Sequence, residues 1–381
     1  MRRPACAVPG RSATGGRAFA GAAAPPYPAR MLSLEYANCL ADRVGEHGLD
    51  PSLLEPGAEP ARAMAAFARR LSQTRGTGWE RWRGLPFDPM RSAHVAGVRD
   101  AVRRCRGRFD NLVVLGIGGS ALGNIALQGA LNPSTYNLLP AAARPGPRVF
   151  VVDNVDPHAL DWVLRFCASP AGGGLGRTLF NVISKSGETA ETAAQFMLAR
   201  DLLRRELGSA YKDNIIAVTD PQRGTMRRIC DAEGFLTLPV PEGVGGRFSV
   251  LSPVGLFSAA MAGIDIDALL DGAAAMDGAC SREGLLENPA AMLAFLLVEL
   301  GTTKGKTNHV LMPYCNALYP LADWFRQLWA ESLGKKSSLT GETSSGQPAI
   351  AAASAGSLGS VRMRVIHARS PAGDASCAPG R

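Results

Sequence analysis

Four short apolar runs in the middle of the chain constrain its fold more than any other feature. They lack alternation of apolar and polar residues, and they read NLVVLGIGG (111–119), RVFVVDNVD (148–156), TLFNVISKS (178–186) and NIIAVTD (214–220). A stretch with helical spacing follows each run. Continuous apolar strands that alternate with helices are typical of a parallel sheet covered on both faces, so we predict an α/β fold.

The segments on either side of these runs have other patterns. Residues 31–106 carry apolar positions mostly at helical spacing. A fifth run, NHVLMPY (308–314), lies between two helical stretches and indicates the start of a second αβα unit. After about Thr343 the sequence is of low complexity and has neither strand nor helix periodicity, so we expect no regular structure there.

The formal net charge of +8 is concentrated at the two ends of the chain. Residues 1–30 carry +5 and residues 344–381 carry +3, which leaves residues 31–343 neutral. A neutral central part gives no reason to expect a nucleic-acid partner. No apolar run is long enough to cross a bilayer. Residues 1–30 are rich in Arg and lack acids, which fits a transit peptide, a disordered extension, or a start codon assigned too early with Met31 as the true start.

The eight cysteines show no pattern that indicates a metal site. They form no CxxC pair, and no histidine stands at metal-ligand spacing from them. Reduced thiols in a cytosolic enzyme explain them more simply than a disulfide framework. We therefore predict neither zinc nor structural disulfides.

The stretch LGIGGSALG (115–123) follows the first predicted strand. Gly116, Gly118 and Gly119 allow a tight turn and a close approach of other backbone. Ser120 lies where the next helix should begin, and the free amides of a helix start can bind an anion. The spacing matches neither GxGxxG nor a P-loop, so the stretch gives little support for a nucleotide.

A second polar junction, ISKSGETAET, follows the third predicted strand. Ser184, Lys185, Ser186 and Thr189 crowd the end of this strand and the start of a helix, and such a group favours a phosphate. Capping of the helix by Ser186 accounts for the same residues. Two polar loops at the carboxyl ends of neighbouring parallel strands favour a ligand site over a simple cap.

Two charged residues occur in apolar segments. Arg247 follows two glycines in EGVGGRFSVLSPVG (242–255), where it either faces an anion or lies on the surface of a glycine-rich loop. Glu331 falls on the same helix face as the apolar residues of 321–328, so we predict that it faces inward. It is a candidate general base, or half of a buried ion pair with Lys335, and the spacing leaves both open.

Four segments, LGIGGSALG, SKSGET, GGRFSVLSPVGL and ADWFRQLWAESLGK, occur together in an order that resembles the glucose-6-phosphate isomerase family in its shorter bacterial form. The resemblance covers residues 31–343. It implies two αβα subdomains of the sugar-isomerase (SIS) type with parallel sheets, at 107–235 and, incomplete, at 236–343, after an N-terminal helical segment at 31–106. It also implies interconversion of glucose 6-phosphate and fructose 6-phosphate, without a cofactor, by a cytoplasmic homodimer.

The resemblance also implies roles for individual residues. By position it assigns substrate contacts to Gly119, Ser120, Ser184, Lys185, Ser186, Thr189 and Gln327. It assigns stabilisation of an enediolate to Arg247, and transfer of a proton between C1 and C2 of the sugar to Glu331. These roles make physical sense because a proton beside a carbonyl is weakly acidic, and its removal needs a carboxylate together with a cation near the developing oxyanion.

The sequence departs from the family soon after Glu331. The family's histidine that assists opening of the sugar ring, and its lysine near the C-terminus, have no counterpart here, and residues 344–381 read as a non-family tail. We therefore expect a chain that is C-terminally truncated or frame-shifted, with impaired activity. A non-catalytic sugar-phosphate-binding protein, or an isomerase of another sugar phosphate, is the alternative.

Overall fold

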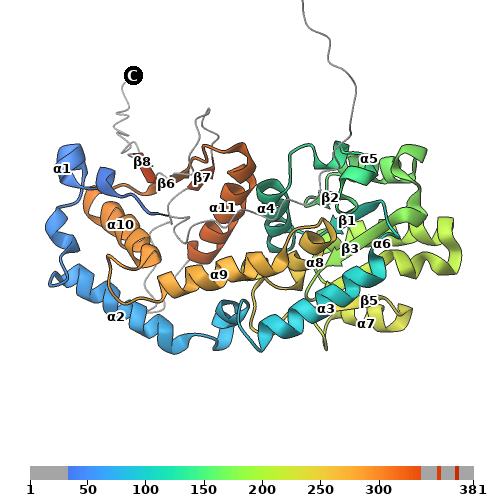
Figure 1. Ribbon diagram of the computed structural model, residues 1–381, viewed down its shortest axis with the longest axis horizontal. Coiled ribbons are helices and arrows are strands. Elements are labelled where there is room, and N and C mark those ends of the chain that lie inside the picture. The colour runs from blue at the N-terminus through green and yellow to red at the C-terminus, as the bar shows by residue number, and fades with distance from the viewer. Residues whose placement is uncertain (1–32, 336–349, 353–364, 369–381) are drawn as a thin grey trace, which may run out of the picture. The chain divides into compact units, whose positions relative to one another are not determined.

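The computed structural model describes residues 33–335, 350–352 and 365–368 (Figure 1). Contacts between residues divide the chain into two units, 1–33 and 34–381. All the described helices and strands belong to the second unit.

Helices and strands alternate in the middle of the chain, as predicted. The α-helices are α1 (Ala41–Val44), α2 (Glu59–Thr74), α3 (Met90–Cys105), α4 (Leu122–Leu131), α5 (Pro157–Ala168), α6 (Ala190–Leu207), α7 (Thr225–Glu233), α8 (Pro253–Met261), α9 (Ile266–Cys280), α10 (Pro289–Lys304) and α11 (Tyr319–Leu333). The strands are β1 (Asn111–Leu115), β2 (Arg148–Val152), β3 (Thr178–Ile183), β4 (Ile215–Thr219), β5 (Leu236–Pro239), β6 (Asn308–Leu311), β7 (Ile350–Ala352) and β8 (Val365–Ala368). The segment 1–30, with its predicted extension or early start, lies outside the described residues.

Strands β1 to β5 form one parallel sheet in the order β2-β1-β3-β4-β5. Leu112 of β1 pairs with Val149 on one side and with Leu179 on the other, and every residue of β1 is buried. The predicted α/β fold with a parallel sheet is confirmed, because each of the four apolar runs contains one of its strands. Strand β5 begins at Leu236, directly after the expected end of the first subdomain at residue 235. The division into subdomains stays a prediction.

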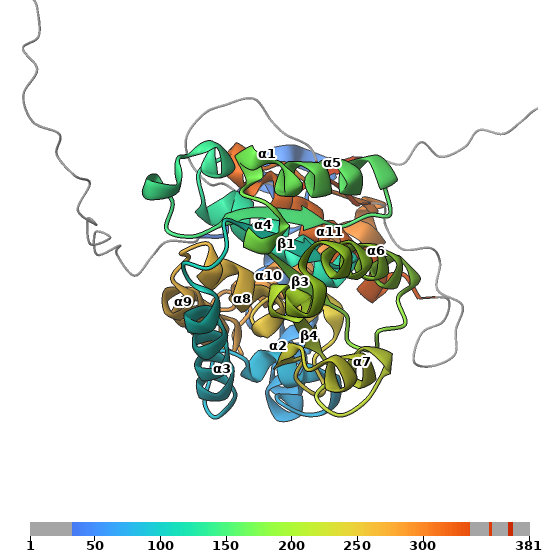
Figure 2. The same cartoon turned by 90° about the vertical axis from the view of Figure 1, so that its right-hand side faces the viewer.

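Alternate residues of the strands face opposite sides of this sheet and build two apolar cores. On one face Leu112 packs in a cluster with Val98 of α3 and Phe257 of α8. On the other face Val113 packs in a cluster with Phe196 of α6. Figure 2 shows α3, α8 and α9 on one side of the strands and α5, α6 and α7 on the other. Because both faces are covered, the edges where the strands end are the places left for polar loops.

A third core lies between α10 and the N-terminal helical region. Phe295 and Leu296 of α10 pack in one cluster with Leu49 and Ala61. Helix α2 contacts α10, and the two lie side by side in Figure 1. The helices α1, α2 and α3 all fall in the segment 31–106, for which helical spacing was predicted.

A second, smaller sheet has β6 at its centre, with β7 parallel to it and β8 antiparallel. The sequence predicts β6, but it predicts no strand beyond Thr343 and no antiparallel pairing. This expectation is wrong at residues 350–352 and 365–368, and the rest of 344–381 lies outside the described residues. The physical reason is that an unpaired strand leaves backbone N–H and C=O groups unsatisfied, and a short segment without strand periodicity can pair with them in either direction.

Three further features bear on the class of protein. No helix in the described part of the chain is long and apolar enough to cross a membrane. The six cysteines in that part are free thiols, and burial raises the pKa of Cys105, Cys167 and Cys230 to about 11. Within the same residues no group of three or more His, Cys, Asp and Glu side chains could hold a metal ion.

Candidate active site

Two glycines in the turn after β1 let other segments approach the carboxyl end of the sheet. The turn is a short 3-10 helix, η5 (Gly118–Ser120). A Cβ on Gly119 would lie 2.3 Å from the backbone carbonyl carbon of Gly246, and a Cβ on Gly118 would lie 2.4 Å from Nε2 of Gln327. A Cβ cannot approach backbone so closely, so Gly119 is what allows the turn and the loop after β5 to meet here, while Gly118 has a positive φ of 56° and leaves room for the Gln327 amide.

Helix α11 reaches this turn because it packs along α4 (Figure 1). A Cβ on Gly129 of α4 would lie 2.8 Å from Cγ of Pro320, so the missing side chain permits close packing of the two helices. Pro320 lies in the first turn of α11, where its missing N–H costs no helical hydrogen bond. The last turns of α11 then present Gln327 and Glu331, which are four residues apart, on the same face of the helix.

The side chains of Arg247, Gln327 and Glu331 form one hydrogen-bonded cluster. Arg247 Nη1 donates to Glu331 Oε2 at 2.7 Å, and Gln327 Nε2 donates to Glu331 Oε1 at 2.9 Å. Arg247 Nε also donates to Ser332 Oγ at 3.2 Å. The structure thus brings together three of the residues that the sequence assigned to one site. Two of them, Arg247 and Glu331, are 84 positions apart in the chain.

Glu331 does not lie on a buried helix face, which corrects the expectation from its spacing. Its side chain is 51% exposed, and Leu321 on the expected inner face is 39% exposed. The carboxylate does not pair with Lys335, whose ammonium donates instead to the Glu331 backbone carbonyl at 2.6 Å. Ala322 is the one buried residue of α11. Spacing identifies a face of a helix, but it does not show what covers that face.

The loop between β3 and α6 contains the four residues predicted to bind phosphate. Ser184 is buried, and its hydroxyl accepts a hydrogen bond from the Gly187 amide at 3.0 Å, so this side chain fixes the shape of the loop. Ser186 is exposed, and its hydroxyl accepts from the amide two residues later at 3.1 Å. Thr189 is exposed, and among the described residues its hydroxyl makes no hydrogen bond.

Helix α6 starts at Ala190, and this position shows whether Ser186 acts as an ordinary helix cap. Thr189, and not Ser186, occupies the N-cap position, and its side chain makes no capping hydrogen bond. The interpretation of Ser186 as an ordinary helix cap is therefore wrong. The first amides of a helix lack partners within the helix and carry partial positive charge, so this end of α6 favours an anion.

Lys185 connects the loop after β3 to the loop after β5. Its ammonium group donates a hydrogen bond to the carbonyl oxygen of Val244 at 3.5 Å. The same nitrogen lies 5.3 Å from the centre of the Trp79 ring. Trp82, in the same N-terminal segment, stacks on Phe248 with ring centres 5.1 Å apart. The N-terminal helical region thus contributes aromatic side chains beside the site, which the sequence analysis missed.

The signals for the missed residues were weak in the sequence. Trp79 and Trp82 lie more than a hundred positions from the loops that they contact, and no motif surrounds them. Ser332 directly follows Glu331, so its position next to a candidate base was the only available hint. Ser120 does lie in the glycine turn, where its backbone carbonyl accepts from Asn124 Nδ2 at 2.9 Å.

The cluster combines groups that suit proton transfer beside an oxygen. A carboxylate can accept a proton, and an adjacent guanidinium can stabilise negative charge on a ligand oxygen. Oε1 of Gln327 is buried and has no hydrogen-bond partner among the described residues, so it can accept from a ligand hydroxyl. Because the Arg247 side chain is only 29% exposed, water screens its charge less than it would on an open surface.

The chain thus combines an α/β fold with a polar site at the carboxyl ends of its parallel strands. A family model described as phosphoglucose isomerase matches residues 99–359, which is more than half of the chain. The chain therefore belongs to the phosphoglucose isomerase family. The match extends past Thr343, where the resemblance read from the motifs ended.

Individual relatives agree with this assignment. The chain is 42% identical over 258 residues to a glucose-6-phosphate isomerase from Carboxydothermus hydrogenoformans, covering 68% of this chain and 54% of the relative. It is 42% identical over 288 residues to a glucose-6-phosphate isomerase from Rubrobacter xylanophilus, and the match covers 74% of this chain and 64% of the relative. The crystal structure of a glucose-6-phosphate isomerase from Chlamydia trachomatis superposes on this structure with a TM-score of 0.67 at 25% sequence identity. The superposition covers 80% of this chain and 62% of that one. The chain thus spans between about half and two thirds of the length of these relatives.

Proposed function

We propose that this chain catalyses the reversible isomerisation of glucose 6-phosphate and fructose 6-phosphate. The observation that carries the proposal is the cluster in which Arg247 and Gln327 both donate to the Glu331 carboxylate. It lies beside the glycine turn after β1, at the edge of the sheet where parallel strands present ligand sites. The names of the relatives from Carboxydothermus and Rubrobacter support the same reaction and substrate.

In the proposed reaction Glu331 acts as the base. Its carboxylate takes the proton from C2 of the open-chain aldose and returns it to C1, while the proton of the C2 hydroxyl moves to the oxygen at C1. Arg247 stabilises the negative oxygen of the enediolate between these two steps. The reaction moves hydrogen within one molecule, so no external oxidant or reductant takes part.

The substrate phosphate is proposed to bind at the loop between β3 and α6. Thr189 and Ser186 offer exposed hydroxyls, Lys185 supplies a cation, and the start of α6 supplies amides. Ser184 acts indirectly, because its hydroxyl holds the Gly187 amide. At the other end of the substrate, we propose that the turn with Gly119 and Ser120 and the amide of Gln327 contact the sugar hydroxyls.

Reduced turnover is part of the proposal. The Glu331 side chain is 51% exposed, so water reaches the proposed base and weakens the field of the neighbouring guanidinium. Binding of the phosphate does not depend on this enclosure. For this reason a sugar-phosphate-binding protein without turnover is the second candidate.

Purified chain assayed with fructose 6-phosphate tests the proposal. Glu331→Gln should lower kcat/KM by about 100- to 10,000-fold, because it removes the base and keeps the shape of the side chain. Glu287→Gln is the matched control, since Glu287 is an exposed carboxylate elsewhere on the chain and should change nothing. Equal turnover in wild type and Glu331→Gln would refute the role of Glu331.

Calorimetric titration with the same sugar phosphate separates the candidates. Binding without turnover in the wild type would favour the binding protein. Faster turnover of an amino-sugar phosphate or of mannose 6-phosphate would favour an isomerase of another sugar phosphate. The homodimer that the resemblance implies is likewise a proposal, which sedimentation velocity tests directly.

A further inference from the structure

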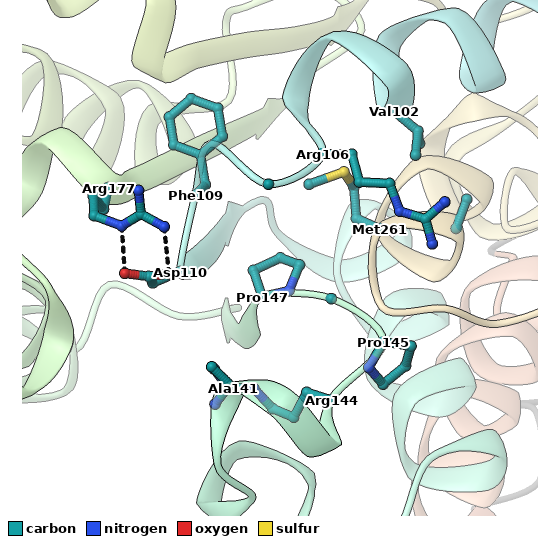
Figure 3. Close-up of a pocket in the computed structure, with 13 residues that line it drawn as sticks. Val102, Arg106, Phe109, Asp110, Ala141, Arg144, Pro145, Pro147, Arg177 and Met261 are labelled. Atoms are coloured by element: carbon teal, nitrogen blue, oxygen red, sulfur yellow. Dashed lines mark hydrogen bonds and ion pairs between the residues drawn. The ribbon is translucent and has the colours of Figure 1, made fainter. Parts of the chain in front are cut away.

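A cavity lies at the opposite edge of the five-stranded sheet, where β1, β2 and β3 begin. Its volume is about 250 Å³. The C-terminal end of α3, the segment that leads into β1, the loop that leads into β2, and the end of α8 all contribute to its lining. Figure 3 shows the pair of Asp110 and Arg177 on one side, Met261 and Arg106 on another, and Arg144 on a third. The candidate active site is at the carboxyl ends of the same strands, so this cavity is separate from it.

Arg144 is the unusual residue of this cavity, because its side chain is a buried cation that forms no ion pair among the described residues, although Asp110 attracts it from farther away. Only 8% of its surface is exposed. Its Nη1 makes one long hydrogen bond, 3.4 Å, to the carbonyl oxygen of Asn137, and its Nε is buried without a partner. No carboxylate among the described residues lies within ion-pair distance of it. A buried guanidinium normally has an anionic partner, since the loss of hydration is otherwise uncompensated.

The electrostatic surroundings of Arg144 increase this need for an anion. Burial, and then repulsion from Arg148, lower the pKa of the Arg144 guanidinium from its usual value, and attraction to Tyr136 and Asp110 offsets this only in part. A guanidinium stays protonated at neutral pH even so. The protein therefore holds a full positive charge in a place that disfavours it.

The other charged residues of the lining leave the cavity positive. Asp110 is already used, because Arg177 donates to its carboxylate through Nε at 2.5 Å and through a terminal nitrogen at 2.8 Å. Arg106, at the exposed rim, has no ion-pair partner among the described residues. Two cations, Arg144 and Arg106, are thus left for one ligand, and the apolar lining includes Phe109.

The wall that carries Arg144 is held in place before any ligand binds. A Cβ on Gly146 would lie 1.8 Å from the carbonyl oxygen of Met261, so the loop before β2 presses directly on the end of α8. The Asn137 side chain donates to the Val149 carbonyl at 2.8 Å and accepts from the Val149 amide at 2.9 Å. A preorganised wall binds a ligand with less loss of conformational entropy than a mobile one.

We propose that this cavity is a binding site for a small organic dianion, namely a phosphate monoester whose phosphate contacts Arg144 and Arg106 and whose compact apolar body contacts Phe109. Two unpaired arginines favour a doubly charged group over a single carboxylate. The apolar part of the lining favours a monoester over inorganic phosphate. The inference does not depend on the proposed isomerase activity, because it concerns a different edge of the sheet.

Isothermal titration calorimetry with phenyl phosphate, at constant ionic strength, tests the site. Wild type should bind the probe. Arg144→Met should weaken that binding by tenfold or more, and Arg106→Met by about threefold or more. Arg103→Met is the matched control and should leave the affinity unchanged, because Arg103 is an exposed arginine in the last turn of α3, three residues before Arg106, and it does not line the cavity.

Two further titrations show whether the probe binds at this cavity and through its charge. Thr189→Val alters the proposed phosphate loop at the other edge, and it should leave binding of phenyl phosphate at the cavity unchanged. Benzyl alcohol, which has a similar body and no charge, should bind at least tenfold more weakly. The proposal is overturned if wild type binds no phenyl phosphate, if both arginine variants bind it as wild type does, if only Thr189→Val loses binding, or if benzyl alcohol binds equally well. Should Arg144→Met fail to fold, Arg106→Met decides, since its side chain is exposed.

Discussion

The two edges of the five-stranded sheet both carry arginines, but they hold them in opposite ways. At the carboxyl edge Arg247 is partly exposed and donates to the Glu331 carboxylate at 2.7 Å. At the amino edge Arg144 is 8% exposed and has no carboxylate partner among the described residues. The nearby carboxylate of Asp110 is bound by Arg177 instead.

This difference shows what each edge can do. A partly exposed ion pair contributes little to stability, about 0 to 1 kcal/mol, so it can open for a substrate at small cost. Water cannot hydrate a buried cation, so we expect an anionic ligand to compensate its charge. The carboxyl edge therefore suits turnover and the amino edge suits binding.

The largest effect that separates the edges should come from Arg247→Met. It should lower kcat/KM for fructose 6-phosphate by about 100- to 1,000-fold, because in the proposed reaction the enediolate oxygen would lose its cation, while the free energy of unfolding changes by less than about 1 kcal/mol. Steady-state kinetics and urea unfolding measure the two quantities. Arg103→Met should affect neither, and an equal loss of turnover in that control would remove the distinction.

A smaller effect, on both activity and stability, should follow from Gly119→Ala. The added Cβ would lie 2.3 Å from the backbone of Gly246, so the turn and the loop after β5 must separate. We expect destabilisation of about 1 to 3 kcal/mol, together with lower turnover. Gly246→Ala is the local control, since nothing lies within 4 Å of its Cβ position. If urea unfolding and kinetics give the same values for both variants, close packing at the turn does not position the site.

The smallest effect concerns the ion pair at the amino edge and depends on pH. Hydrogen bonds from Arg177, opposed by burial, lower the pKa of the Asp110 carboxyl. A carboxyl with a lowered pKa in the folded state stabilises the fold at pH values above its unfolded pKa of about 3.9. The contribution is lost as the pH falls through the lower pKa of the folded state. Asp110→Asn should therefore cost about 1 kcal/mol at pH 7, and less and less below about pH 4.

Urea unfolding of wild type and Asp110→Asn between pH 3 and pH 7 measures this contribution. Asp161→Asn provides the comparison, because Asp161 pairs with Arg165 one helical turn away and both side chains are well exposed. That variant should cost only about 0.3 to 0.5 kcal/mol. A cost for Asp110→Asn that stays constant down to pH 3 would contradict the assigned pKa shift.

Much of the fold could be predicted from the sequence because its signals are local. The strands β1 to β4 each lie in an apolar run, and a parallel sheet follows from the lack of alternation. Strand β5 was missed, since LTLP (236–239) is only four residues long and just one of them, Leu238, is buried. Strands β7 and β8 were missed because pairing with β6, and not their own sequence, makes them strands.

The sequence names residues for the candidate site, but it does not predict the contacts between them. Glycines before Arg247 and a carboxylate in an apolar helix are visible in the sequence, and so the residues could be named. The pairing of Glu331 with Arg247 in place of Lys335 could not be predicted, because it depends on how closely α11 approaches the turn after β1. The contribution of Trp79 likewise depends on where the N-terminal helical region lies.

The sequence by itself determined the strands β1 to β4 with the helices that follow them, and it named the candidate site residues, because periodicity and residue type are properties of neighbouring positions. The tertiary structure alone decided which charges are paired and which are buried. Glu331 is half exposed although its spacing predicts burial, and Arg144 is buried although nothing in its segment predicts it. The reason is physical: exposure and pairing depend on the distances between segments far apart in the chain, and those distances are fixed when the sheet and helices pack.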